Sequence, residues 1–259
     1  MKQASDWHLW LLGFFSGLLS VTLGVGSGLV ITAALTLAHY GIKRAVGVAL
    51  ALLVVTSLAS VAARCAVGSC DASADVAALV VVGGVVGAWV GVRLLKGISE
   101  TLLVRLFALV LLATSLRLAF AAWFGTGGSV GAHASPWLTG LGFVGGLASA
   151  LFGVSGGVVF VPALTLLFGF GVSEAVSNSL VVVFPVAVFI TWLRQSSLPV
   201  DFVMVQRLLV PALVGVVAGA FLVGVLSESL IMTGVALLLA VVAVRLVLKP
   251  PAAKRHGIE

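Results

Sequence analysis

The sequence predicts an all-α protein that crosses a membrane several times, and three observations support this class. Of its 259 residues, 61% are hydrophobic and 8% are charged, whereas a soluble domain carries about 25% charged residues to cover its surface. Apolar runs close to the roughly 20 residues that span a bilayer as a helix follow one another with short connections. Finally, one glycine motif occurs twice inside apolar sequence. These observations predict a polytopic membrane protein built from two tandem homologous repeats.

The glycine motif marks the two repeats. It runs from Gly13 to Gly28 in the first half and from Gly142 to Gly157 in the second. Matched pairs are Gly13/Gly142, Phe14/Phe143, Gly17/Gly146, Ser20/Ser149, Gly24/Gly153, Val25/Val154, Gly28/Gly157 and, further on, Lys43/Ser173, Arg64/Arg194 and Asp71/Asp201. We predict a single integral membrane domain, composed of repeat 1 (residues 1–124), a Gly/Ser-rich linker (125–136), repeat 2 (137–248) and a basic cytoplasmic tail (249–259).

Each half contains four hydrophobic segments, and the first of them is too long for one simple crossing. Because a glycine cluster lies near its middle, we expect this segment to consist of two short helices that meet at the glycines, followed by three transmembrane helices. The segments are 9–39, 45–67, 76–95 and 101–124 in the first half, and 137–168, 175–193, 202–225 and 229–248 in the second.

The distribution of Lys and Arg bears on topology. If each long segment crosses once, the two halves are parallel and the 14 basic residues divide nine against five between the two sides. If each long segment returns to its own side as a hairpin, the halves are inverted, and only Arg64 and Arg117 lie opposite the other twelve. The positive-inside rule favours the hairpins and predicts that both termini are cytoplasmic. Four true crossings per half remain the alternative.

The glycine breaks are the predicted substrate site. A helix that begins near Ser27 or Ser155 leaves its first N–H groups without intrahelical partners, and its dipole adds partial positive charge there. Two such ends would bind an anion without a buried Lys or Arg. The alternative is that the glycines serve only close helix packing. The predicted substrate-binding residues at the breaks are Gly24, Gly26, Ser27, Gly28, Gly153, Ser155, Gly156 and Gly157.

Small polar residues follow the second break. Ser177, Asn178 and Ser179 begin the next hydrophobic segment, and an intramembrane Asn is costly unless it has a partner. They are candidates for substrate contact, with a local helix-start role as the alternative. Their counterparts in the first half, Gly47-Val-Ala49, are apolar, which predicts an asymmetric site.

At these motifs the chain resembles the TauE/SafE sulfite exporter family, of the toluene-sulfonate uptake permease type. The family carries a glycine motif followed by a proline in each half; Gly153-Val-Ser-Gly-Gly157 with Pro162 is close to it, whereas Ala33 replaces the proline in the first copy. The resemblance implies a structural role for Pro162. It also implies a transporter of small sulfur-containing anions, such as sulfite, sulfonates or thiosulfate, located in the inner membrane.

The remaining residues exclude other classes of function. No nucleophile–base pair and no cluster of metal-ligating residues is apparent, so we expect neither an enzyme nor a metal site, and no cofactor. The basic residues are scattered at segment ends, which indicates contact with a lipid bilayer and not with nucleic acid. A non-transporting membrane subunit or scaffold remains the alternative function. The sequence leaves open the oligomeric state and whether Cys65 and Cys70 form a disulfide.

Overall fold

The computed structural model describes residues 6–24, 26–38, 40–124, 136–194 and 200–223, together with six single positions between 233 and 244. The predicted segment 229–248 lies mostly outside the described residues, as do nearly all of the Gly/Ser-rich linker and the whole basic tail. Within the described ranges every regular element is an α-helix, which confirms the predicted all-α class.

The helices follow the predicted hydrophobic segments closely. The first half contains α1 (Asp6–Leu23), α2 (Ser27–Leu37), α3 (Ile42–Ala66), α4 (Ala74–Gly97) and α5 (Glu100–Phe124); the second contains α6 (Trp137–Phe152), α7 (Gly157–Leu167), α8 (Val172–Arg194) and α9 (Phe202–Leu222). Helices α3, α4, α8 and α9 each contain a stretch long and apolar enough to span a membrane. Large side chains such as Leu116 and Phe221 point outward, which suits a lipid environment. The chain is thus a multi-pass membrane protein.

Both long segments are broken at their glycines, as predicted. Gly24 and Gly153 each have φ 64°, in the left-handed region that a residue with a side chain rarely adopts. The amide of Gly24 donates to the carbonyl of Ser20 at 3.1 Å, and that of Gly153 donates to the carbonyl of the matched Ser149 at 2.9 Å. The same backbone geometry therefore ends α1 and α6 and turns the chain into the next helix.

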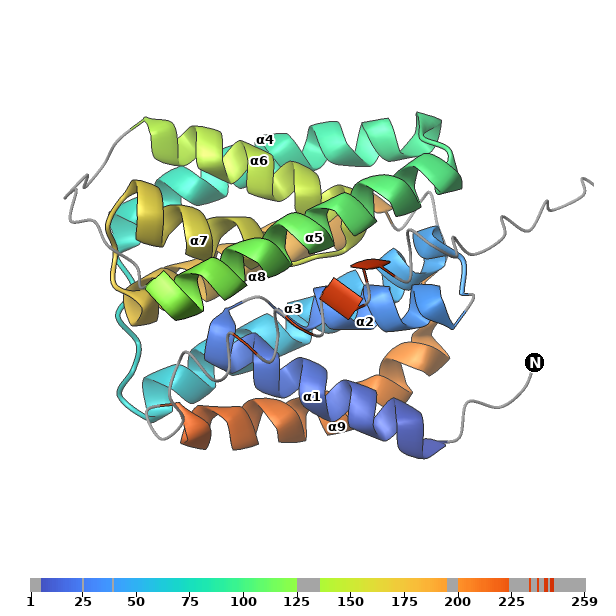
Figure 1. The fold of residues 1–259 in the computed structure, drawn as a ribbon, viewed down its shortest axis with the longest axis horizontal. Coiled ribbons are helices and arrows are strands. Elements are labelled where there is room, and N and C mark those ends of the chain that lie inside the picture. The colour runs from blue at the N-terminus through green and yellow to red at the C-terminus, as the bar shows by residue number, and fades with distance from the viewer. Residues whose placement is uncertain are drawn as a thin grey trace, which may run out of the picture.

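The two broken segments fold back on themselves (Figure 1). In the figure α1 runs from right to left and α2 returns toward the right, whereas α6 runs from left to right and α7 returns toward the left. Helices α3 and α8 lie between these pairs and contact each other along the centre of the bundle. The turns of both hairpins consequently lie well inside the bundle.

The outer helices pack through glycine. Helix α1 lies along α9, and α6 lies along α4 (Figure 1). A Cβ atom added at Gly17 of α1 would overlap the carbonyl of Ala212, and one added at the matched Gly146 of α6 would overlap the carbonyl of Gly84. In a bilayer, where apolar surface gains little from burial between helices, such close backbone approach supplies much of the packing energy.

Candidate functional site

The two glycine breaks contact each other in the centre of the protein. A Cβ atom added at Gly28 would lie less than 3.0 Å from the carbonyl oxygen of Gly153, which is closer than real Cβ atoms come to other atoms. A Cβ atom added at Gly157 would be equally too close to the carbonyl oxygen of Gly24. These two contacts are equivalent under the repeat, since Gly24 matches Gly153 and Gly28 matches Gly157. The fold thus brings together two segments that are separated by about 129 residues in the sequence.

Two helix N-termini lie at this junction. Helix α2 begins at Ser27 and α7 at Gly157, and their N-cap residues are Gly26 and Gly156. Neither N-cap provides a side-chain hydrogen bond to the first turn. The dipoles of both helices therefore place partial positive charge at the junction. In α7 the amides of Val158 and Val159 already donate to the carbonyls of Ser155 at 3.2 Å and of Gly156 at 2.8 Å. A buried pair of such ends attracts an anion.

The serines of the two breaks are fully enclosed but differ in their contacts. Ser27 is buried, and its hydroxyl hydrogen-bonds that of Thr56 on α3 at 2.7 Å. Ser155 is also buried, and its side chain lies against Gly26, whose φ of 71° and ψ of 152° are accessible to glycine alone. In the alignment of the two halves, Ser155 matches Gly26 and not Ser27. Ser155 accordingly lies against the backbone of the other break.

The predicted Ser-Asn-Ser segment divides between two locations. The hydroxyl of Ser179 donates to the carbonyl of Gly24 at 3.2 Å, so Ser179 lies at the junction. By contrast, Ser177 donates to the carbonyl of Ser69 at 3.1 Å, and Asn178 accepts from the amide of Ser73 at 3.0 Å. These two residues hold the loop between α3 and α4 at the end of the bundle.

The junction is filled by the protein itself. Gly28 meets the backbone of Gly153, and Gly157 meets that of Gly24, too closely for a methyl group at either Gly28 or Gly157. These contacts leave no room for a ligand between the breaks in this conformation.

Thr32 is a polar residue near the junction that the motif analysis missed. It is fully buried on α2, and among the described residues its hydroxyl meets no hydrogen-bond partner. It lies four residues after Gly28 and hence on the same helix face. The matched residue in α7, Val161, contacts Gly24. A hydroxyl group within an apolar helix was the available signal, but such residues usually bond to their own helix.

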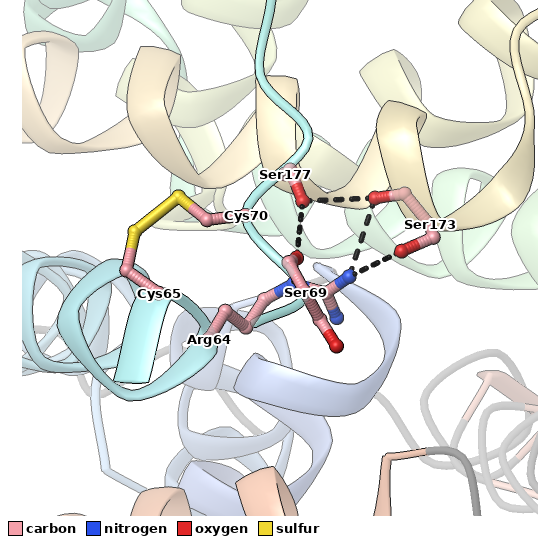
Figure 2. Close-up of a disulfide and its surroundings, with 6 residues drawn as sticks. All are labelled: Arg64, Cys65, Ser69, Cys70, Ser173 and Ser177. Atoms are coloured by element: carbon pink, nitrogen blue, oxygen red, sulfur yellow. Dashed lines mark hydrogen bonds between the residues drawn. A yellow bond between two sulfur atoms is a disulfide. The ribbon is translucent and has the colours of Figure 1, made fainter. Parts of the chain in front are cut away.

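One end of the bundle is held by Arg64 (Figure 2). Its Nε donates to the carbonyl of Ser69 at 3.2 Å and its Nη1 to the carbonyl of Val21 at 3.2 Å. Its Nη2 donates to the hydroxyl of Ser173 at 2.8 Å and to the carbonyl of the same residue at 3.3 Å. Arg64 thereby joins α1, the loop after α3 and the start of α8. Beside it, Cys65 and Cys70 form a disulfide, which the sequence left open.

The opposite end carries a second polar cluster. Tyr40, before α3, donates to the carboxylate of Asp201, which also caps α9 by accepting from the amide of Met204 at 3.1 Å. Burial, and then the bond to Asp201, raise the pKa of the Tyr40 phenol to about 12. The same bond lowers the pKa of the Asp201 carboxyl. Donor and acceptor therefore keep their protonation states throughout the neutral pH range.

Pro162 lies within α7, five residues after its first residue. Across the residues that the structure describes, no group of three or more His, Cys, Asp or Glu is arranged to hold a metal ion.

Comparison with known proteins links the second half of the chain to one family. Residues 138–258 match the family model described as sulfite exporter TauE/SafE. This match confirms the predicted resemblance for the second half of the chain, which contains Gly153 to Gly157 and Pro162, whereas the first copy of the glycine motif lies outside the matched residues. No curated protein and no solved structure matches the chain.

Proposed function

Given that its second repeat matches the sulfite exporter TauE/SafE family, we propose that this protein is a secondary transporter of small sulfur-containing anions, such as sulfite or sulfonates. It acts in the inner membrane by alternating access around the junction of the two glycine breaks. The substrate site comprises the uncapped first turns of α2 and α7, with the hydroxyl groups of Ser27, Ser155 and Ser179 beside them.

The observation that carries this proposal is the meeting of two uncapped helix N-termini in the interior. An anion replaces part of its hydration shell with oriented N–H groups there, which is how helix ends bind anions in transporters built from broken helices. The residues of the junction carry no formal charge, so the site neutralises only part of the anion's charge. A weakly held anion is released readily, as transport requires.

We also propose that the halves are inverted repeats, with both termini cytoplasmic. Two pairs of reciprocal contacts support this arrangement. Arg64 at the end of α3 donates to Ser173 at the start of α8, while the matched Arg194 at the end of α8 donates to the carbonyl of Lys43 at the start of α3 at 3.1 Å. The glycine contacts of the junction are reciprocal in the same way. Pseudo-twofold symmetry accounts for both pairs at once.

The topology is tested by labelling cysteines. In the inverted arrangement Cys65 and Cys70 lie on the opposite side of the membrane from the N-terminus, whereas in the parallel arrangement they lie on the same side. After the disulfide is reduced in right-side-out vesicles, a membrane-impermeant maleimide is expected to label both cysteines. A protease cleavage site placed at the N-terminus is expected to stay protected from added protease. Labelling from the cytoplasmic side alone would contradict the inverted arrangement. The double variant Cys65→Ser, Cys70→Ser is the control that gives no labelling.

Transport is tested with serine variants in proteoliposomes. We expect the wild type to take up labelled sulfite, and we expect Ser27→Ala and Ser179→Ala each to reduce uptake about tenfold, the effect of one hydrogen bond to a charged group. Ser16→Ala is the matched control, because Ser16 is buried in α1 and, among the described residues, its hydroxyl donates to the carbonyl of Gly13 alone, at 2.7 Å. It should transport within about twofold of wild type.

The competing function, a non-transporting membrane subunit, makes the opposite prediction. Folded wild-type protein would then move none of sulfite, thiosulfate, sulfonates or sulfate, and no anion would raise its melting temperature. If neither serine substitution affects transport, the protein is a transporter but its substrate site does not lie at the junction.

A further inference from the structure

The last residue of α8 carries a charge that the protein neutralises incompletely. Arg194 is only 3% exposed, and its Nη2 donates to the carbonyl of Lys43. Its Nε and Nη1 are buried and, among the described residues, meet no hydrogen-bond partner. A buried guanidinium stays charged, and leaving its donors unpaired is strongly unfavourable. These two nitrogen atoms therefore have unused capacity to bind an acceptor.

A hydroxyl group with unused capacity lies one turn earlier. Thr191 precedes Arg194 by three residues, so the two side chains lie on the same face of α8. Its Oγ1 is also buried and without a partner in the described part of the chain. The end of α8 thus gathers a cationic donor group and a hydroxyl donor that the surrounding helices leave unpaired.

The matched arginine of the first half, Arg64, shows that burial at this position does not by itself leave the hydrogen-bond donors of the guanidinium unpaired. Arg64, its equivalent in the first repeat, is 2% exposed, yet its Nε, Nη1 and Nη2 all donate to oxygen atoms of the protein. Both halves carry an arginine at this position, but only Arg64 has an acceptor for each of its three nitrogen atoms. The unpaired donors are therefore a specific property of the second repeat.

We propose that Arg194 and Thr191 bind a small oxyanion, at a site separate from the glycine junction. One edge of the planar guanidinium, which combines an unpaired nitrogen with the second hydrogen of Nη2, presents two parallel donors that fit a sulfite, sulfate or phosphate group, and the Thr191 hydroxyl adds a third. Lys43 and the exposed Arg44 begin the neighbouring helix and raise the local concentration of anions. The occupant is either a free oxyanion or the phosphate of a lipid headgroup. The inference rests on Arg194 and Thr191 and does not depend on transport.

Equilibrium binding of labelled sulfite to the full-length protein tests the site. In phosphatidylcholine nanodiscs we expect Arg194→Gln to lack one class of sulfite-binding sites that the wild type shows. We expect Thr191→Val to lower the affinity of that class for sulfite about tenfold. Thr191→Val is nearly isosteric and keeps the test valid if Arg194→Gln fails to fold. Thr36→Val is its control, because the Thr36 hydroxyl is already bonded to the carbonyl of Thr32 at 2.6 Å.

The same experiment separates this site from the junction and from lipid. If the junction binds no anion, the Arg194-dependent class still remains, and Ser27→Ala leaves it unchanged. If a lipid phosphate is the occupant, phosphatidylglycerol in the nanodisc displaces this class of sulfite, and Arg194→Gln loses the co-purified anionic lipid. The proposal is overturned if Arg194→Gln and Thr191→Val both retain wild-type binding of sulfite and of anionic lipid.

Discussion

Gly157→Ala is expected to prevent the two hairpins from meeting and to destabilise the protein more than any other single methyl group added to it. The new Cβ would overlap the carbonyl oxygen of Gly24 and lie 2.6 Å from the hydroxyl of Ser179. Backbone cannot move aside as a flexible side chain can, so relief requires α7 to shift relative to the other break. Overpacking of this kind costs about 3 kcal/mol, the upper end of its usual range.

The measurement is the melting temperature of purified protein, together with the fraction that elutes as a single species from size exclusion. Gly28→Ala should behave in the same way, since its Cβ would meet the carbonyl of Gly153. Gly47→Ala is the matched control: it also lies in a buried helix, but nothing is within 4 Å of its added Cβ. Wild-type stability of Gly157→Ala would show that the breaks do not pack as described.

Arg64→Gln is expected to have the second largest effect. The substitution removes the donors that serve the carbonyls of Val21, Ser69 and Ser173, which come from three different parts of the chain. Each buried acceptor left without a partner costs about 1–3 kcal/mol, so a total near 3–5 kcal/mol is expected after partial relaxation. The loop that carries the disulfide should also become accessible to proteases.

Arg93→Gln is the control for Arg64→Gln. Arg93 is exposed and lies over the ring of Trp89, with its Cζ 3.4 Å from the ring centroid. Its replacement should change stability by no more than about 0.5–1 kcal/mol. If Arg64→Gln melted as close to wild type as Arg93→Gln does, the Arg64 hydrogen bonds would contribute little to holding α1, α3 and α8 together.

The helices and their breaks were predictable because they depend on local properties. A bilayer-length apolar run forms a helix wherever it occurs, since its backbone must satisfy its own hydrogen bonds in lipid. Gly24 and Gly153 mark the breaks because only glycine adopts their φ of 64° without strain. The repeat then indicated that the two breaks are equivalent, although it carried no distance between them.

The composition of the site was only partly predictable. Ser177, Asn178 and Ser179 look alike in sequence, yet Ser179 alone contacts the opposite break, while its two neighbours hold the loop after α3. Thr32 carried too weak a signal to be chosen. In each case the outcome depends on which residue lies opposite, and a helical period of 3.6 residues turns consecutive side chains in different directions.

The sequence by itself determined the membrane class, the approximate bounds of the described helices and the two glycine breaks, because hydrophobicity and backbone freedom are properties of the chain alone. The tertiary structure decided that the two breaks touch, that Cys65 and Cys70 are bonded, and that Arg64 finds acceptors for every nitrogen while Arg194 does not. These outcomes depend on neighbours that are mostly more than 40 residues away in sequence. The packing of α3 against α8 brings those neighbours together, and no local pattern encodes it.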